Sequence, residues 1–223
     1  MDKSTSAVLN KNAVLKSLSV MILTVALIFL CAGRWWYWQG ILYCALMISM
    51  FLVSAFFVAH DPGLINEGLK PGQGVKAWDK AYLSASTNLL FITISLSALD
   101  SGRAGLSPGL PVYVYVIASV VYIAGNLIFA WAKAVRIQKE QGSMVYYGGP
   151  YRYVRHPGYL GSILHRAVTP LLLGSLWGLI PTGVELVLIL VRTALEDKTL
   201  ECELEGYKEY QAKVKYRLIP LIW

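Results

Sequence analysis

Residues 36–59 read WYWQGILYCALMISMFLVSAFFVA, a run of 24 residues without a charged side chain. The hydrocarbon core of a bilayer is about 30 Å thick, and a helix needs roughly 20 mostly apolar residues to cross it. Because lipid offers no partners for exposed backbone groups, a run of this kind must form a helix. The stretch therefore predicts a transmembrane helix.

Three further apolar runs lie at residues 15–33, 81–99 and 111–132, and the single charged residue among them is Lys16, near the start of the first. Glycine- and proline-containing turns separate the runs. Of the 223 residues, 56% are hydrophobic and only 15% are charged, which is far from the average for a soluble domain. We therefore expect an all-α fold, a polytopic membrane helical bundle forming a single domain, in which residues 1–132 provide a scaffold of four transmembrane helices.

The distribution of basic residues predicts the orientation of the bundle. Lysines precede the first run and join the second to the third, and five basic residues follow the fourth, whereas the other side carries only Arg34 and Arg103. The positive-inside rule then places both termini in the cytoplasm, with the chain in a bacterial inner membrane or the endoplasmic reticulum. The net charge of +7 is spread between apolar runs instead of forming one patch, so no nucleic-acid partner is expected. The three cysteines lack metal-ligand spacing, and no metal site is predicted.

Two shorter apolar segments follow the fourth run and are separated by a breaker: they cover residues 157–174 and 182–195, with LIPTG at 179–183 between them. Arg166, Glu185 and Arg192 lie within these segments, and a charged side chain that faces lipid is costly. We therefore predict a tilted or partly re-entrant helical hairpin whose charged residues face protein or a cavity. Its second helix is expected to continue to about residue 212.

The first cluster with chemical potential is GGPYRYVRHPGYLG at residues 148–161. Aromatic rings can stack on an adenine nucleoside, and glycine lets a ligand approach the backbone closely. A helix that starts with proline offers free amide groups to an anionic carboxylate. An interfacial loop, with tyrosines as anchors and arginines at lipid head groups, would have the same composition.

The second cluster is RTALED at residues 192–197. Arg192 and Glu196 are four residues apart and share a helix face, and Glu185 lies on nearly the same face. An arginine here can hold a carboxylate, while a glutamate can bind ribose hydroxyls or an ammonium group. The alternative is an ion pair within the helix, between Arg192 and Glu196. His165, beside Arg166, is either a structural hydrogen-bond donor or a base.

Three blocks of the sequence, in order and spacing, resemble the isoprenylcysteine carboxyl methyltransferase family and the related phospholipid methyltransferases. They are GPYRYVRHPGYLG at 149–161, RTALEDKTL at 192–200 and GYKEYQAKVKYRLIPLIW at 206–223. The resemblance implies an integral membrane enzyme that uses S-adenosyl-L-methionine. Since no strand followed by a Gly-x-Gly-x-x-Gly turn is present, a Rossmann domain is not expected. The cofactor would instead be wrapped by loops and helix ends in residues 133–223, facing the cytoplasm.

The resemblance also implies which residues form the site. The expected cofactor-binding residues are Ser143, Met144, Val145, Tyr146, Tyr151, His156, Pro157, Gly158, Tyr159 and Glu196. Arg192 is expected to contact the acceptor. The sequence departs from the family pattern at Ser143, where a histidine is usual. It departs again at Asp197, which completes a Glu-Asp pair in place of two glutamates, a change expected to matter little.

The acceptor is expected to be a lipophilic small molecule or a prenylated carboxylate that enters from the bilayer, and membrane lipids are the other expected partners. The catalytic role is assigned to Arg192, with Glu185 or His165 as the base if the acceptor is an amine. Three alternatives remain: a phospholipid or amine N-methyltransferase, a sterol-type NADPH-dependent membrane reductase with a basic cluster at 133–139, and a membrane protein without enzymatic activity. The sequence gives no indication of an oligomeric state.

Overall fold

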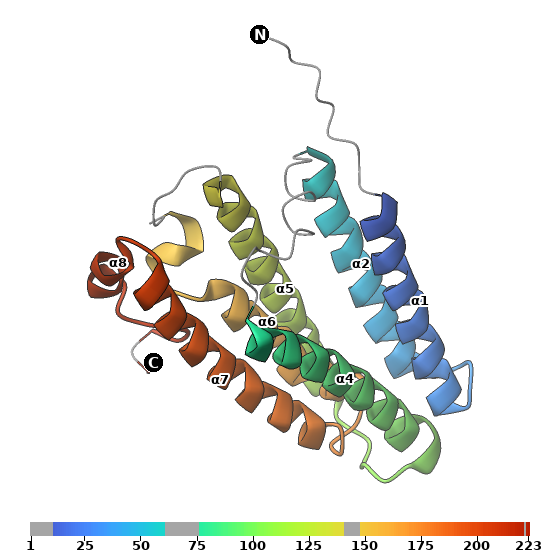
Figure 1. The fold of residues 1–223 in the computed structure, drawn as a ribbon. Coiled ribbons are helices and arrows are strands. Elements are labelled where there is room, and N and C mark those ends of the chain that lie inside the picture. The colour runs from blue at the N-terminus through green and yellow to red at the C-terminus, as the bar shows by residue number, and fades with distance from the viewer. Residues whose placement is uncertain (1–10, 61–75, 141–147, 221) are drawn as a thin grey trace.

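The computed structural model describes residues 11–60, 76–140, 148–220 and 222–223, with the backbone alone at 11–14, 56–60 and 136–140. Within these residues the chain forms seven α-helices and no β-strand (Figure 1). The helices are α1 (Lys11–Ala32), α2 (Trp38–His60), α4 (Ala77–Leu99), α5 (Val112–Glu140), α6 (Pro157–Leu172), α7 (Leu179–Glu203) and α8 (Tyr207–Lys213). A π-helical turn, η1 (Asp100–Ala104), follows α4, and a 3₁₀ turn, η2 (Gly149–Arg152), precedes α6. The predicted all-α class is confirmed.

Four helices among the described residues are long and apolar enough to cross a membrane, in agreement with the four predicted runs. The apolar stretches are Leu15–Ala32, Trp38–Ala55, Ala77–Ala104 and Val112–Val135. Large apolar side chains remain exposed along them, among them Leu30, Leu52 and Val120. Lipid accommodates such surfaces, whereas a soluble monomer rarely exposes them over a large area. The structure therefore supports a polytopic membrane bundle.

The hairpin of α6 and α7 differs from the prediction at both of its boundaries. The predicted break at 179–183 is wrong, because α7 begins at Leu179 and places Pro181 in the first turn, where its missing N–H loses no hydrogen bond. The turn lies between α6 and α7, where Gly174 has a φ of +71°. The predicted continuation to residue 212 is also wrong, since α7 ends at Glu203 and α8 starts after Gly206.

The α5 and α6 helices approach each other through glycine. A Cβ atom on Gly161 would lie 2.6 Å from both the Gly125 carbonyl oxygen and the Phe129 nitrogen, and a Cβ on Gly125 would lie 2.7 Å from the His165 nitrogen. Small residues let helix backbones meet in this way within a membrane. The contact fixes α6, and with it the segment that leads into α6, against the scaffold.

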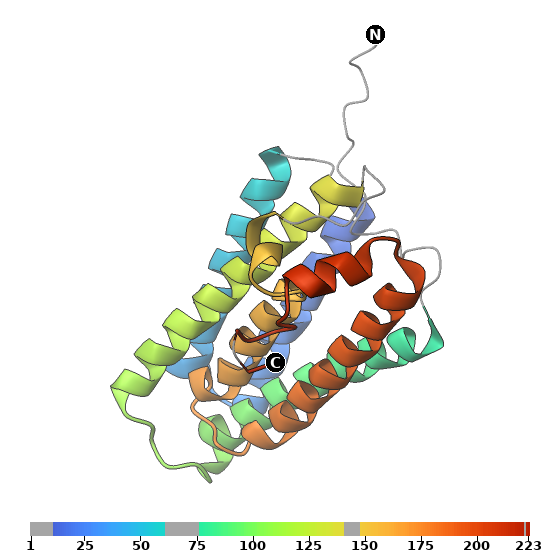
Figure 2. The same ribbon diagram turned by 90° about the vertical axis from the view of Figure 1, so that its left-hand side faces the viewer.

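The two ends of the bundle have different roles. The start of α1 and the ends of α2, α5 and α7 lie toward one end of the bundle, where α8 follows the end of α7 (Figures 1 and 2). The opposite end is closed by Asp100, which accepts hydrogen bonds from the backbone N–H of Ser107 and from the hydroxyls of Ser107 and Ser175. The described residues predicted to bind the cofactor, Tyr151, residues 156–159 and Glu196, lie at the first end.

Candidate active site

The segment that leads into α6 is held by the C-terminal tail. Pro157 occupies the first position of α6, where proline is well tolerated. Just before it, the backbone N–H groups of Arg155 and His156 each donate a 2.9 Å hydrogen bond, to the carbonyls of Tyr216 and Arg217 respectively. The tail therefore lies directly against the Arg-His-Pro segment.

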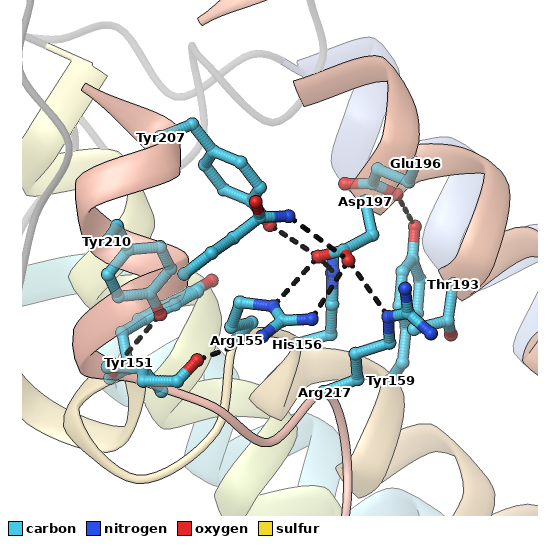
Figure 3. Close-up of polar contacts among 12 residues, drawn as sticks. Tyr151, Arg155, His156, Tyr159, Thr193, Glu196, Asp197, Tyr207, Tyr210 and Arg217 are labelled. Atoms are coloured by element: carbon cyan, nitrogen blue, oxygen red, sulfur yellow. Dashed lines mark hydrogen bonds and ion pairs between the residues drawn. The ribbon is translucent and has the colours of Figure 1, made fainter. Parts of the chain in front are cut away.

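One buried carboxylate, that of Asp197, organises this region (Figure 3). It is 1% exposed and accepts hydrogen bonds from Arg155 through Nε and Nη2, each at 2.9 Å. Further donors are His156 Nε2 at 3.1 Å, the Tyr207 hydroxyl at 2.7 Å and Arg217 Nε at 2.9 Å. Burial alone would raise the pKa of Asp197, but these hydrogen bonds outweigh it and hold the pKa well below its usual range.

Further contacts dock α8 and the tail onto the same segment. Arg155 Nη1 donates to the carbonyls of Val214 and Lys215, at 2.9 Å each. The Tyr210 hydroxyl donates to the carbonyl of Tyr151 at 2.8 Å. Tyr210 is 2% exposed, so this bond lies in the interior of the interface. The predicted cofactor residue Tyr151 thus lies under α8.

Tyr159 and Glu196 form a second polar contact on the other side of His156 (Figure 3). The Tyr159 hydroxyl donates to Glu196 Oε2. The His156 ring stacks on the Tyr159 ring, with centroids 5.7 Å apart and an interplanar angle of 19°. Among the described residues, a Cβ atom on the neighbouring Gly158 would meet Ala132 alone, at 3.8 Å, so packing against these residues does not require glycine there. Four of the predicted cofactor residues, His156, Gly158, Tyr159 and Glu196, therefore lie together.

Arg192 lies next to this group and contacts α4. Its Nη2 is 2.8 Å from Asp79 Oδ1, and its guanidinium carbon lies over the rings of Tyr82 and Tyr159, at 4.4 and 5.1 Å from their centroids. Among the described residues, the ion-pair partner of Arg192 is Asp79 and not Glu196. The alternative of an ion pair within α7 is therefore not what the structure shows.

A family model described as the isoprenylcysteine carboxyl methyltransferase (ICMT) family matches residues 111–202. The matched stretch runs from the start of α5 almost to the end of α7 and includes the Arg-His-Pro segment, Tyr159, Arg192 and Glu196. The match covers 92 of the 223 residues, and this part of the chain is similar to the ICMT family. No curated protein matches the chain. The family match supports the assignment of a membrane methyltransferase.

Within the ICMT-family segment, Glu185 and His165 lie apart from the Tyr159–Glu196 contact. Glu185 is 1% exposed, pairs with Arg166 and accepts a 2.9 Å hydrogen bond from Ser86. His165 faces α5, where its ring packs edge-on against Tyr122 and its Nδ1 is 2.9 Å from the Gly161 carbonyl. As predicted, the charged residues of the hairpin face protein, but the structure does not bring His165 together with Arg192.

The remaining sequence-predicted residues of the ICMT-family site, Ser143, Met144, Val145 and Tyr146, lie outside the described residues. Sequence reasoning missed Asp79 and Tyr82 on α4, which the structure places against Arg192. It also assigned no structural role to Asp197. The pattern that could have indicated one is a second acid beside Glu196, with basic residues in both the Arg-His-Pro segment and the tail.

Proposed function

We propose that the protein is an S-adenosyl-L-methionine-dependent membrane methyltransferase that methylates the carboxylate of a lipophilic acceptor. The ICMT-family match supports the reaction class. The observation that carries the finer assignment is the position of Arg192, whose guanidinium lies over the same Tyr159 ring that contacts Glu196 and His156. A cation that can hold a carboxylate thus adjoins the residues expected to bind the cofactor.

The side chains around Tyr159 fit the chemistry of S-adenosyl-L-methionine. The partly exposed Tyr159 ring offers an aromatic surface to an adenine ring, and the buried His156 ring supports it by stacking. Glu196 offers carboxylate oxygens to ribose hydroxyls or to the ammonium group. Gly158 has no side chain to keep a ligand from the backbone of the first turn of α6, and the N-terminal end of a helix favours an anionic carboxylate.

The proposed reaction needs little acid or base chemistry from the protein. When bound, the cofactor supplies a methyl group on a positively charged sulfur that needs no further activation. A carboxylate acceptor has no proton to lose, so a bond forms between its oxygen and the methyl carbon while the carbon–sulfur bond breaks. The tasks left to the chain are alignment of the acceptor by Arg192 and exclusion of water, to which the docked tail contributes.

The acceptor is proposed to be an acid on a long apolar chain, such as an isoprenylcysteine, with the site at the cytoplasmic end of the bundle. Methylation of an amine is less well supported. An amine would need a base, and the Glu185 carboxylate is already bound by Arg166 and Ser86.

The test is ligand binding followed by turnover, with purified protein in detergent. S-adenosylhomocysteine should raise the temperature of thermal unfolding, and NADPH should not. Transfer of a labelled methyl group from S-adenosyl-L-methionine to N-acetyl-S-farnesylcysteine should occur, while the carboxamide of the same compound should accept none.

A matched pair of variants makes the test specific. Glu196→Gln keeps the size of the side chain but removes its charge, so it should weaken binding of S-adenosylhomocysteine. Glu203→Gln, on the last turn of the same helix, pairs with Lys76 away from Tyr159 and should bind like the wild type. Stabilisation by NADPH alone would refute the proposal in favour of a reductase.

A further inference from the structure

Three helices direct polar side chains toward one another at helical spacing, and we call this set the polar seam. Its members are Asp79, Tyr82 and Ser86 on α4, Tyr159 and Arg166 on α6, and Glu185, Arg192 and Glu196 on α7. On each helix the members are separated by three, four or seven residues, which keeps them on one face. The seam begins at the Tyr159–Glu196 contact and runs along the hairpin toward its turn.

Two ion pairs cross the polar seam and join different helices. Arg192 of α7 pairs with Asp79 of α4, at 2.8 Å. Arg166 of α6 pairs with Glu185 of α7 and also donates a 3.0 Å hydrogen bond to Ser86 of α4. The two cations are therefore balanced by two anions, which allows charged groups to lie between membrane helices.

The hydrogen bonds of these two arginines are incomplete. Six buried polar atoms in the described side chains lack a hydrogen-bond partner, and three of them belong to the polar seam: Nε of Arg166, Nε of Arg192 and Oδ1 of Asp79. Oδ1 of Asp79 is paired by charge with Arg192, whereas each Nε–H group is a donor. Buried donors without partners are rare and need an explanation. A ligand that satisfies both must accept hydrogen bonds.

The two arginines contact consecutive turns of the same face of α4. Arg166 donates to the Ser86 hydroxyl, and the ring of Tyr82, four residues earlier, lies 4.4 Å from the Arg192 guanidinium carbon. Apolar side chains are exposed beside the seam, among them Leu83, which follows Tyr82 on α4. An acid whose long chain lies in lipid would match both features, with its head group in the seam and its chain along the flanks.

We propose that Arg166 is a second acceptor-binding residue and that, together with Arg192, it holds the acceptor carboxylate inside the polar seam. This inference rests on the proposed function, because it assigns the acceptor site of the same reaction. It defines the substrate class as a membrane-dissolved carboxylic acid. Arg166 sets specificity for the acid and takes no part in binding the cofactor.

The competing explanation is that Arg166 and Glu185 only hold α6 to α7. Removing one partner would leave the other charged and buried, which is enough by itself to destabilise the fold. The decisive variant therefore replaces both, as Arg166→Met with Glu185→Met, which removes the charges while keeping long side chains. The control is Lys76→Met with Glu203→Met. This pair of changes removes a 2.7 Å ion pair between Lys76, the residue just before α4, and Glu203 at the end of α7, outside the seam.

The experiment uses protein in detergent and first measures binding of S-adenosylhomocysteine. It then measures the change in unfolding temperature on adding N-acetyl-S-farnesylcysteine, oleic acid or the primary amide of either acid. The third measurement is of KM and kcat for methyl transfer to N-acetyl-S-farnesylcysteine. We expect the acids, and not the amides, to stabilise the wild type. In the Arg166/Glu185 double variant, cofactor binding should be kept, stabilisation by the acids lost, and KM raised about 10- to 100-fold, as for loss of a charge-assisted hydrogen bond. The Lys76/Glu203 variant should behave like the wild type.

The outcomes separate this inference from the proposed function. If the Arg166/Glu185 variant is stabilised by the acids as the wild type is, with unchanged KM, the pair is structural and the inference is wrong. If S-adenosylhomocysteine stabilises the wild type but neither acid does, the acid site is refuted while the cofactor assignment stands. If S-adenosylhomocysteine itself does not bind, the proposed function fails first.

Discussion

Replacing Asp197 with asparagine tests whether one carboxylate docks the C-terminal tail. Asparagine keeps the shape but turns one oxygen into an NH₂ donor, and both oxygens of Asp197 face donors. If the amide nitrogen of the asparagine takes the place of Oδ1, it faces the donors of Arg155, His156 and Tyr207. If it takes the place of Oδ2, it faces the donors of Arg155 and Arg217. No orientation of the amide therefore restores the network.

The size of this effect follows from burial. Removing one partner from a buried, hydrogen-bonded ion pair costs about 3–5 kcal/mol, because the other charges stay uncompensated. Arg155 is only 9% exposed, so it cannot recover these bonds from water. We expect the docked tail to open about 10²- to 4 × 10³-fold more often, since about 1.4 kcal/mol corresponds to a factor of ten.

Hydrogen–deuterium exchange in detergent measures this opening directly. The most informative amides are those of Arg155 and His156, because both donate to carbonyls of the tail. Glu196→Gln is the matched control, since Glu196 is the neighbouring acid and contacts Tyr159 instead of the tail. If exchange at these two amides in Asp197→Asn stays within about threefold of the Glu196→Gln control, the docking role assigned to Asp197 is wrong.

Three further predictions concern pH, packing and the acceptor. Because the pKa of Asp197 is held below its usual value, tail docking should be fully stable above about pH 4 and should weaken as the pH falls further. In Asp197→Asn this pH dependence should disappear, and comparing amide exchange at pH 3 and pH 6 measures it. Gly158→Ala should weaken binding of S-adenosylhomocysteine without lowering the unfolding temperature, whereas Gly161→Ala should destabilise the fold by about 1–3 kcal/mol because its Cβ would press on α5. Arg192→Ala should abolish turnover with cofactor affinity largely kept, and an equal loss of affinity in isothermal titration would contradict its assignment to the acceptor.

The membrane helices could be predicted from sequence because lipid imposes one simple requirement on them. A run of about 20 residues without charge can satisfy its backbone only as a helix. The boundary that matters for the site was misplaced at the start of α4, which begins at Ala77 and not at residue 81. The search for uncharged runs excluded the turn that contains Asp79 and Lys80, and it therefore removed from the membrane helix the very residue that pairs with Arg192.

The candidate site was only partly predictable because its contacts join distant segments. Resemblance brought together His156, Tyr159 and Glu196, which the structure places in contact. The role of Asp197 could not be foreseen, because its partners come from the Arg-His-Pro segment, α8 and the tail, and periodicity within α7 says nothing about them. The exchange of glutamate for aspartate at this position looked minor, yet the structure places the shorter side chain at the centre of a network of donors.

The adjacent acids Glu196 and Asp197 link the proposed chemistry to the closure of the site. Consecutive residues on a helix point about 100° apart, so one turn of α7 can direct Glu196 toward Tyr159 and Asp197 toward the tail. His156 connects the two sides, since its ring stacks on Tyr159 and its Nε2 bonds to Asp197. Opening of the tail would therefore also release the ring that supports the cofactor-binding group. A variant that loosens the tail should thus weaken cofactor binding even though it changes none of the residues expected to touch the cofactor.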